Sequence, residues 1–86
     1  MPPRRNIIHK PEFDAALFNL HHTAPRCDEF VHGITEILHI DPTRGKRIGS
    51  TDIWCFSTPD IPEFLALVVY YTFNDDTVWL LWIDTP

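Results

Sequence analysis

Two strongly apolar segments near the end of the chain constrain its fold more than any other feature. Residues 64–73 and 78–83 are rich in β-branched and aromatic side chains, and the polar residues 74–77 between them suit a tight turn. A strand with one face in water alternates apolar and polar residues, whereas these segments are apolar on both faces. We therefore expect a hairpin at the centre of a sheet covered on both faces, with function sought at the cover that helices do not provide.

The preceding sequence predicts one short strand and two helices. Residues 6–10 form the strand candidate, and Pro11 then suits the first turn of a helix that extends to about Leu20. A second helix should begin near Pro25 and end before Pro42, because the residue before a proline disfavours helical geometry. We expect the two helices to form an αα-hairpin packed on one face of the sheet.

One further strand is predicted between the helices and the final hairpin. Residues 52–57 alternate polar and apolar side chains, which is typical of a strand at the edge of a sheet. Residues 43–50 are expected as a basic, glycine-containing loop, and residues 58–63 as a proline-rich connection. The predicted order is β-α-α-β-β-β, an α+β fold with an antiparallel sheet in a single domain of residues 1–86.

Composition narrows the classes of function. Seven Lys and Arg stand against twelve Asp and Glu, a net charge of −5, which disfavours nucleic-acid binding through the overall field but leaves a local basic patch open. No apolar run reaches the ~18 residues of a membrane helix, so we expect no membrane attachment. Without a recognisable signal peptide, we expect reduced thiols and a cytoplasmic location. The 13% share of aromatic residues favours a partner that covers apolar surface.

The cysteine and histidine spacing predicts neither a metal nor a cofactor. Cys27 and Cys55 form no C-x-x-C pair, and reduced, idle thiols are the better interpretation. Three residues share one side of the second helix: His32, Glu36 and His39. That side is opposite the apolar stripe, so a solvated polar face is favoured over a metal site, and His21-His22 is a weaker signal still.

A cluster of cations after the second helix is the clearest candidate for a binding site. Arg44, Lys46 and Arg47 lie beside Gly45 and Gly49. The glycines would let the backbone approach a phosphate, and three cations would hold it. The alternative is a solvated loop near a helix C-terminus, where cations are favoured in any case.

Four short motifs occur in an order that matches a known family. They are Pro11-Glu12-Phe13 at the first helix, residues 37–45 like "L-x-x-x-P-x-x-G", Ile53-Trp54 at a short strand, and residues 68–78 like "R-V-x-Y-x-x-x-D-D-x-V". Together with the β-α-α-β-β-β order, they make the chain resemble the RelE/ParE superfamily of bacterial toxins from type II toxin–antitoxin systems.

The resemblance implies a toxin that inhibits translation by cleaving or binding messenger RNA on the ribosome, with a cognate antitoxin as partner. In RNA-cleaving members, cations and an aromatic on the open sheet face orient the RNA; cleavage needs transition-state stabilisation and proton transfer at the 2′-hydroxyl. Carried over by position, the catalytic candidates are Arg44, Lys46, Arg47 and Tyr71. The RNA-binding candidates are the same three cations with Tyr70.

Two departures from the family pattern keep an alternative open. Residues 65–68 are apolar where the family usually places an arginine, and the chain ends at residue 86 where active members carry a basic and aromatic tail. The alternative is a non-catalytic protein-interaction module, or a self-associating domain such as a homodimer, that keeps the fold without ribonuclease activity.

The three tryptophans bear on the choice between an RNA-binding toxin and a protein-interaction module. Trp54, Trp79 and Trp82 can stack bases, but more often such residues fill a core or a protein interface. A two-residue turn at residues 75–76 predicts that Val69 pairs with Trp82 and Thr72 with Trp79. Trp79 and Trp82 should then point to opposite faces of the sheet, at least one of them away from the helices.

Overall fold

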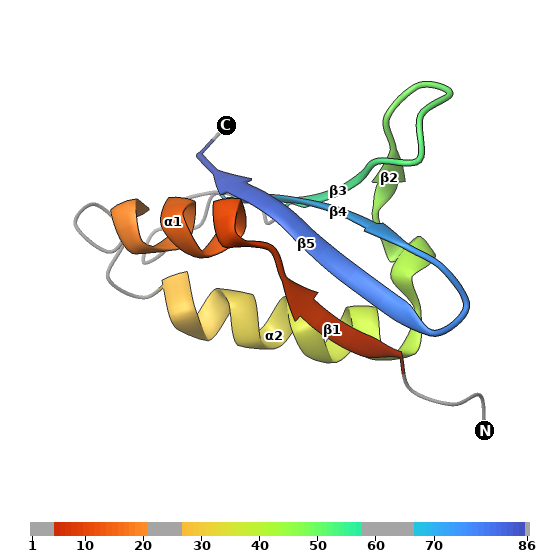
Figure 1. Cartoon of the computed structure of the whole chain (residues 1–86), viewed down its shortest axis with the longest axis horizontal. Helices are drawn as coiled ribbons and strands as arrows, with labels where there is room; N and C mark the ends of the chain where they lie inside the picture. The colour runs from red at the N-terminus through yellow and green to blue at the C-terminus, as the bar shows by residue number, and fades with distance from the viewer. Residues whose placement is uncertain (1–4, 21–26, 58–66, 86) are drawn as a thin grey trace.

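Two helices and a mixed five-stranded sheet make up the computed structural model, which describes residues 5–20, 27–57 and 67–85 (Figure 1). The elements are β1 (Asn6–His9), α1 (Pro11–Leu20), α2 (Cys27–Ile40), the one-turn 3-10 helix η1 (Pro42–Arg44), β2 (Lys46–Arg47), β3 (Trp54–Ser57), β4 (Val68–Phe73) and β5 (Thr77–Asp84). Neighbouring strands follow the order β1-β5-β4-β3-β2. The α+β class is therefore confirmed.

Local signals place the helix ends where the sequence predicts them. α1 spans Pro11–Leu20, and α2 ends at Ile40, directly before Asp41-Pro42. Asp41 caps the turn that follows, because its carboxylate accepts from the hydroxyl and the backbone N–H of Thr43, and these bonds lower the pKa of Asp41. The expected start of α2 at Pro25, the pair His21-His22 and the connection at residues 58–63 lie outside the described residues.

The prediction of an antiparallel sheet is wrong at one edge. β1 pairs with β5 in parallel, from Asn6 opposite Thr77 to His9 opposite Leu80. The backbone N–H of Asn6 bonds to Asp76 O at 2.8 Å and that of Lys10 to Leu80 O at 3.0 Å. A four-residue apolar pattern carries no information about strand direction. The helices α1 and α2 and the strands β2 to β4 separate β1 from β5 in the chain, and β1 lies beside β5 in the same direction.

The predicted basic loop is also partly a strand. Lys46 pairs with Cys55 and Arg47 with Trp54, so β2 forms the edge of the sheet and β3 lies one position inside it. β2 spans only two residues, which is too short to show an apolar period. Its pairing depends on β3 rather than on its own sequence.

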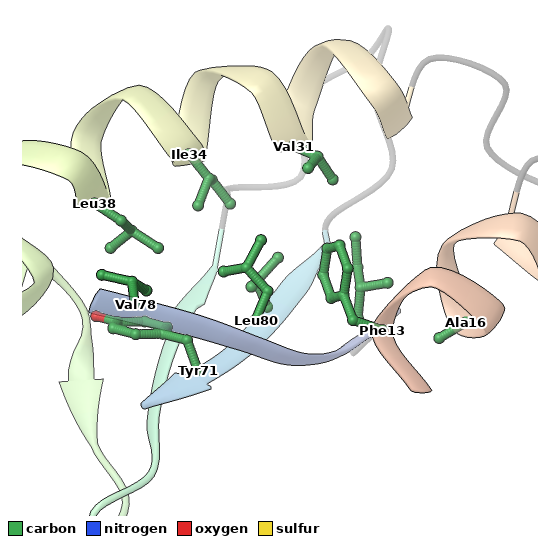
Figure 2. Close-up of a cluster of buried hydrophobic side chains, with 10 residues drawn as sticks. Phe13, Ala16, Val31, Ile34, Leu38, Tyr71, Val78 and Leu80 are labelled. Atoms are coloured by element: carbon green, nitrogen blue, oxygen red, sulfur yellow. The ribbon is translucent and has the colours of Figure 1, made fainter. Parts of the chain in front are cut away.

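Both helices pack on one face of the sheet and share a single core. Figure 2 shows side chains of α1 and α2 directed toward Tyr71, Val78 and Leu80 on β4 and β5. The buried cluster comprises Phe13, Ala16, Val31, Ile34, Leu38, Val69, Tyr71, Val78, Leu80 and Ile83. The helix-side cover of the hairpin, expected from its apolar sequence, is thus confirmed.

A β-bulge decides where the tryptophans point. Thr72 pairs with Trp79 as predicted, and Tyr71 pairs with Leu80. The register then shifts, so that Tyr70 pairs with Trp82 and Leu81 is the extra residue. The predicted pairing of Val69 with Trp82 is wrong, and so are the opposite faces: both tryptophans lie on the face away from the helices.

Candidate functional site

The sheet face away from the helices, which we call the open face, carries the candidate site. Residues paired across strands share a face, and buried Val69, Tyr71, Val78 and Ile83 mark the helix side, so their neighbours in the strands point outward. The outward positions are Asn6, Ile8, Lys46, Cys55, Ser57, Val68, Tyr70, Thr72, Thr77, Trp79, Trp82 and Asp84. Ile8 is 45% exposed and Trp82 is 44% exposed, which is high for large apolar side chains.

One row of side chains crosses this face from edge to centre. Lys46 pairs with Cys55, Cys55 with Tyr70, and Tyr70 with Trp82, so the row spans β2, β3, β4 and β5. Neighbouring strands lie ~4.8 Å apart, and directly paired side chains are in reach of one another. The row therefore places a cation and a free thiol beside two aromatic rings.

A shallow recess of about 200 Å³ opens beside the cationic end of this row. It is lined by Arg44, Gly45, Lys46, Cys55, Phe56 and Ser57. Arg44 comes from η1 and Lys46 from β2, so the turn at Gly45 brings the two cations to one side. Two cations and a serine hydroxyl around an open recess suit a phosphate or another small anion.

Arg47 is directed away from its two neighbouring cations. It pairs with Trp54, whose ring packs against the core, and therefore lies on the helix-side face of β2. Its Nε donates to Thr51 O at 2.7 Å and its terminal nitrogen to Ser50 O at 3.3 Å. These bonds hold the loop between β2 and β3, so the structure separates Arg47 from the recess that Arg44 and Lys46 share.

Tyr71, predicted as a catalytic candidate, is a core residue. Its side chain is 0% exposed and its hydroxyl donates to the Pro42 carbonyl oxygen. Burial raises the pKa of Tyr71 to about 12, although a hydrogen bond from the backbone of Gly45 acts in the opposite direction. RNA could not reach this ring; its role is to anchor the turn that carries Arg44 and Lys46.

Gly45 is required for that anchor. A Cβ at this position would collide with the Cys55 carbonyl oxygen and the Tyr71 hydroxyl, and would lie 3.1 Å from the Cys55 carbonyl carbon. The backbone angles of Gly45, φ −81° and ψ −163°, are open to any residue, so the requirement is for space. Gly45 thus allows the turn to approach β3 and β4 closely, rather than approaching a ligand itself.

Tyr70 is the tyrosine that the open face retains. It is partly exposed and lies between Cys55 and Trp82 in the row. The sequence analysis missed Cys55 and Ser57 as members of the site, and it named Trp82 as a possible base-stacking residue without fixing its face. Alternation along residues 52–57 is the signal that places Cys55 and Ser57 on one face, but no sequence signal reveals the bulge that turns Trp82 outward.

The remaining candidates do not form a site within the described residues. His39 lies near β1, where its Nδ1 donates to Arg5 O at 2.6 Å. No group of three or more metal-ligating side chains lies together in the ranges 5–20, 27–57 and 67–85. No helix in these ranges is long and apolar enough to cross a membrane.

Comparisons with protein-family models, curated proteins and solved structures give no match to this chain.

Proposed function

We propose that this chain is a toxin-like component of a type II toxin–antitoxin system that inhibits translation by binding messenger RNA through the open face of its sheet. The proposal rests on one observation: Arg44 and Lys46 line a recess beside β2 and β3, and Lys46 shares the uncovered face of the sheet with Tyr70. Cations that hold a phosphate, next to an aromatic ring that stacks a base, are the two elements of single-stranded RNA binding.

The geometry supports binding more directly than cleavage. Arg44 and Lys46 are exposed and can pair with a phosphate. Lys46 pairs with Cys55 on the adjacent strand, and Cys55 pairs with Tyr70 on the next strand. Cleavage additionally needs proton transfer at the 2′-hydroxyl. Since Tyr71 is buried, Tyr70 is the tyrosine that would supply this transfer on the open face.

A second function is favoured by a different observation. Ile8 and Trp82 are nearly half exposed on the open face, and the net charge of −5 disfavours long-range attraction of RNA. A non-catalytic protein-interaction module with the same fold would use this apolar surface to bind its partner, such as a cognate antitoxin.

Lys46 and Arg47 lie on opposite faces of β2, so substitutions of these two cations provide a sharp test of the RNA site. Each of Arg44→Ala and Lys46→Ala should weaken binding to a short single-stranded RNA by ~10- to 150-fold, which corresponds to the loss of a charge-assisted contact of ~1.5–3 kcal/mol. Arg47→Ala changes the net charge equally but lies on the other face, so the RNA affinity should change less than ~3-fold. Fluorescence anisotropy at fixed salt measures all three.

Variants of Tyr70 test base stacking in the same binding assay. Tyr70→Phe keeps the ring and should keep RNA affinity, whereas Tyr70→Ala should lose the ~1–3 kcal/mol of base stacking. Growth arrest on expression should follow RNA affinity across these variants. Equal effects of Lys46→Ala and Arg47→Ala would refute the site. Wild-type protein that binds no RNA and arrests no growth would leave the interaction module as the function.

A further inference from the structure

The charges on the open face form a self-complementary pair. Among the outward positions of the five strands, only Lys46 and Asp84 carry a charge. Lys46 lies on the edge strand β2, and Asp84 lies at the end of β5, on the far side of β3 and β4. Both are exposed, and the surface between them is formed largely by Cys55, Val68, Tyr70 and Trp82. We propose that this face is the interface of a symmetric homodimer in which Lys46 of each copy meets Asp84 of the other.

A two-fold axis satisfies both pairs at once. Three strand spacings separate β2 from β5, about 14 Å at ~4.8 Å per spacing. A two-fold axis that lies in the interface, above β3 and β4, brings Asp84 of one copy opposite Lys46 of the other. Such an isologous contact therefore places each Lys46 opposite an Asp84, and it stacks the aromatic centre of one copy on that of the other.

The distribution of acidic residues favours this face over others for self-association. Glu12 and Asp14 lie on α1, Glu29 and Glu36 on α2, and Asp75 and Asp76 at the tip of the β4–β5 hairpin. A chain of net charge −5 repels its copy wherever these groups meet. The outward strand positions of the open face carry one charge of each sign, Lys46 and Asp84, so exposed Ile8 and Trp82 lie on a face without net repulsion.

The size of the face sets the expected strength. The five strands are two to eight residues long. Their face covers roughly 20 Å by 20 Å, so two copies would bury on the order of 800 Å². Stable interfaces bury ~1,200–2,000 Å², so this dimer belongs to the weak class and should form at tens to hundreds of micromolar. The inference does not depend on RNA binding, but a second copy would cover Tyr70 and compete with RNA.

Charge exchange tests the pairing. Sedimentation velocity on the full chain from about 5 to 500 µM should show concentration-dependent dimerisation of the wild type. Lys46→Asp and Asp84→Lys should each weaken it by at least ~5-fold, because like charges then face each other. The double variant Lys46→Asp with Asp84→Lys should recover the wild-type dissociation constant.

Asp75→Lys is the matched control, because it raises the net charge as much as Asp84→Lys but lies at the hairpin tip. It should leave dimerisation unchanged or strengthen it. If Asp84→Lys does not fold, Asp84→Asn carries the same comparison against Asp75→Asn. A wild type that stays monomeric throughout, equal effects at Asp84 and Asp75, or a double variant that stays monomeric would each overturn the proposal. RNA affinity of Asp84→Lys, expected to be undiminished, reports separately on the proposed function.

Discussion

Tyr71→Phe removes one buried hydroxyl and nothing else from the centre of the fold. The ring is 0% exposed and packs among Val69, Val78 and Leu80, so its apolar contacts remain. The hydroxyl donates to the Pro42 carbonyl oxygen and accepts from the backbone of Gly45. Leaving a buried polar group without its partner costs ~1–3 kcal/mol. We therefore expect the free energy of unfolding to fall by about 2 kcal/mol, since Pro42 is buried.

Thermal and chemical unfolding measure this change directly. In a domain of this size, ~1 kcal/mol shifts the melting temperature by ~4–8 °C, so Tyr71→Phe should melt roughly 8–16 °C below wild type. Tyr70→Phe is the matched control: it is the same chemical change one residue away, on the partly exposed open face. Its effect should stay within ~0.5 kcal/mol. Equal stability of the two variants would refute the anchoring role of the Tyr71 hydroxyl.

The raised pKa of Tyr71 predicts that the stability of wild type and of Tyr71→Phe will depend differently on pH. Burial raises this pKa from an ordinary value near 10 to about 12. Below pH 10 the hydroxyl keeps its proton in both folded and unfolded chains, so its contribution is complete. Between pH 10 and 12 the unfolded chain releases the proton first, and stability falls. Wild type should therefore lose more stability than Tyr71→Phe across this window.

Two further predictions test the local geometry. Gly45→Ala should destabilise the fold by ~1–3 kcal/mol because its Cβ meets Cys55 and Tyr71, whereas Gly33→Ala, with open space in α2, should stabilise it by ~0.5–1 kcal/mol; urea unfolding that shows the same sign for both would contradict this. Asn74→Ala should cost about 1 kcal/mol in the same assay, because the Asn74 Oδ1 accepts from the backbone N–H groups of Asp76 and Thr77 at 2.8 and 2.9 Å. Asn74→Asp keeps the acceptor and should lose less than Asn74→Ala.

Local signals were enough to predict the start of α1, the end of α2 and the hairpin. Pro11 starts α1 and Asp41-Pro42 ends α2, because proline limits the backbone within one or two residues of itself. The turn at residues 75–76 also follows from nearby polar side chains, and the pairing of Thr72 with Trp79 depends on that turn alone. These features are decided within a few residues of chain, so the sequence predicts them without knowledge of the fold.

The candidate site was predicted as a set of residue types but not as a geometry. Arg44 and Lys46 lie together as expected, whereas Arg47 turns to the other face once β2 pairs with β3. Successive residues of a strand point to opposite faces of the sheet, so Tyr70 lies on the open face and Tyr71 in the core, a choice that the sequence leaves open.

Tertiary structure alone decided the direction of β1 and the positions of the tryptophans. Both depend on pairings between residues distant in the chain, which no local pattern encodes. The parallel contact of β1 with β5 depends on the whole path between them, which includes both helices and the strands β2 to β4. A single extra residue, Leu81, reverses the facing of every later position in β5 relative to a regular strand. It places Trp82 beside Tyr70 and directs Ile83 into the core, because burial of an apolar side chain outweighs the local disruption of one ladder step.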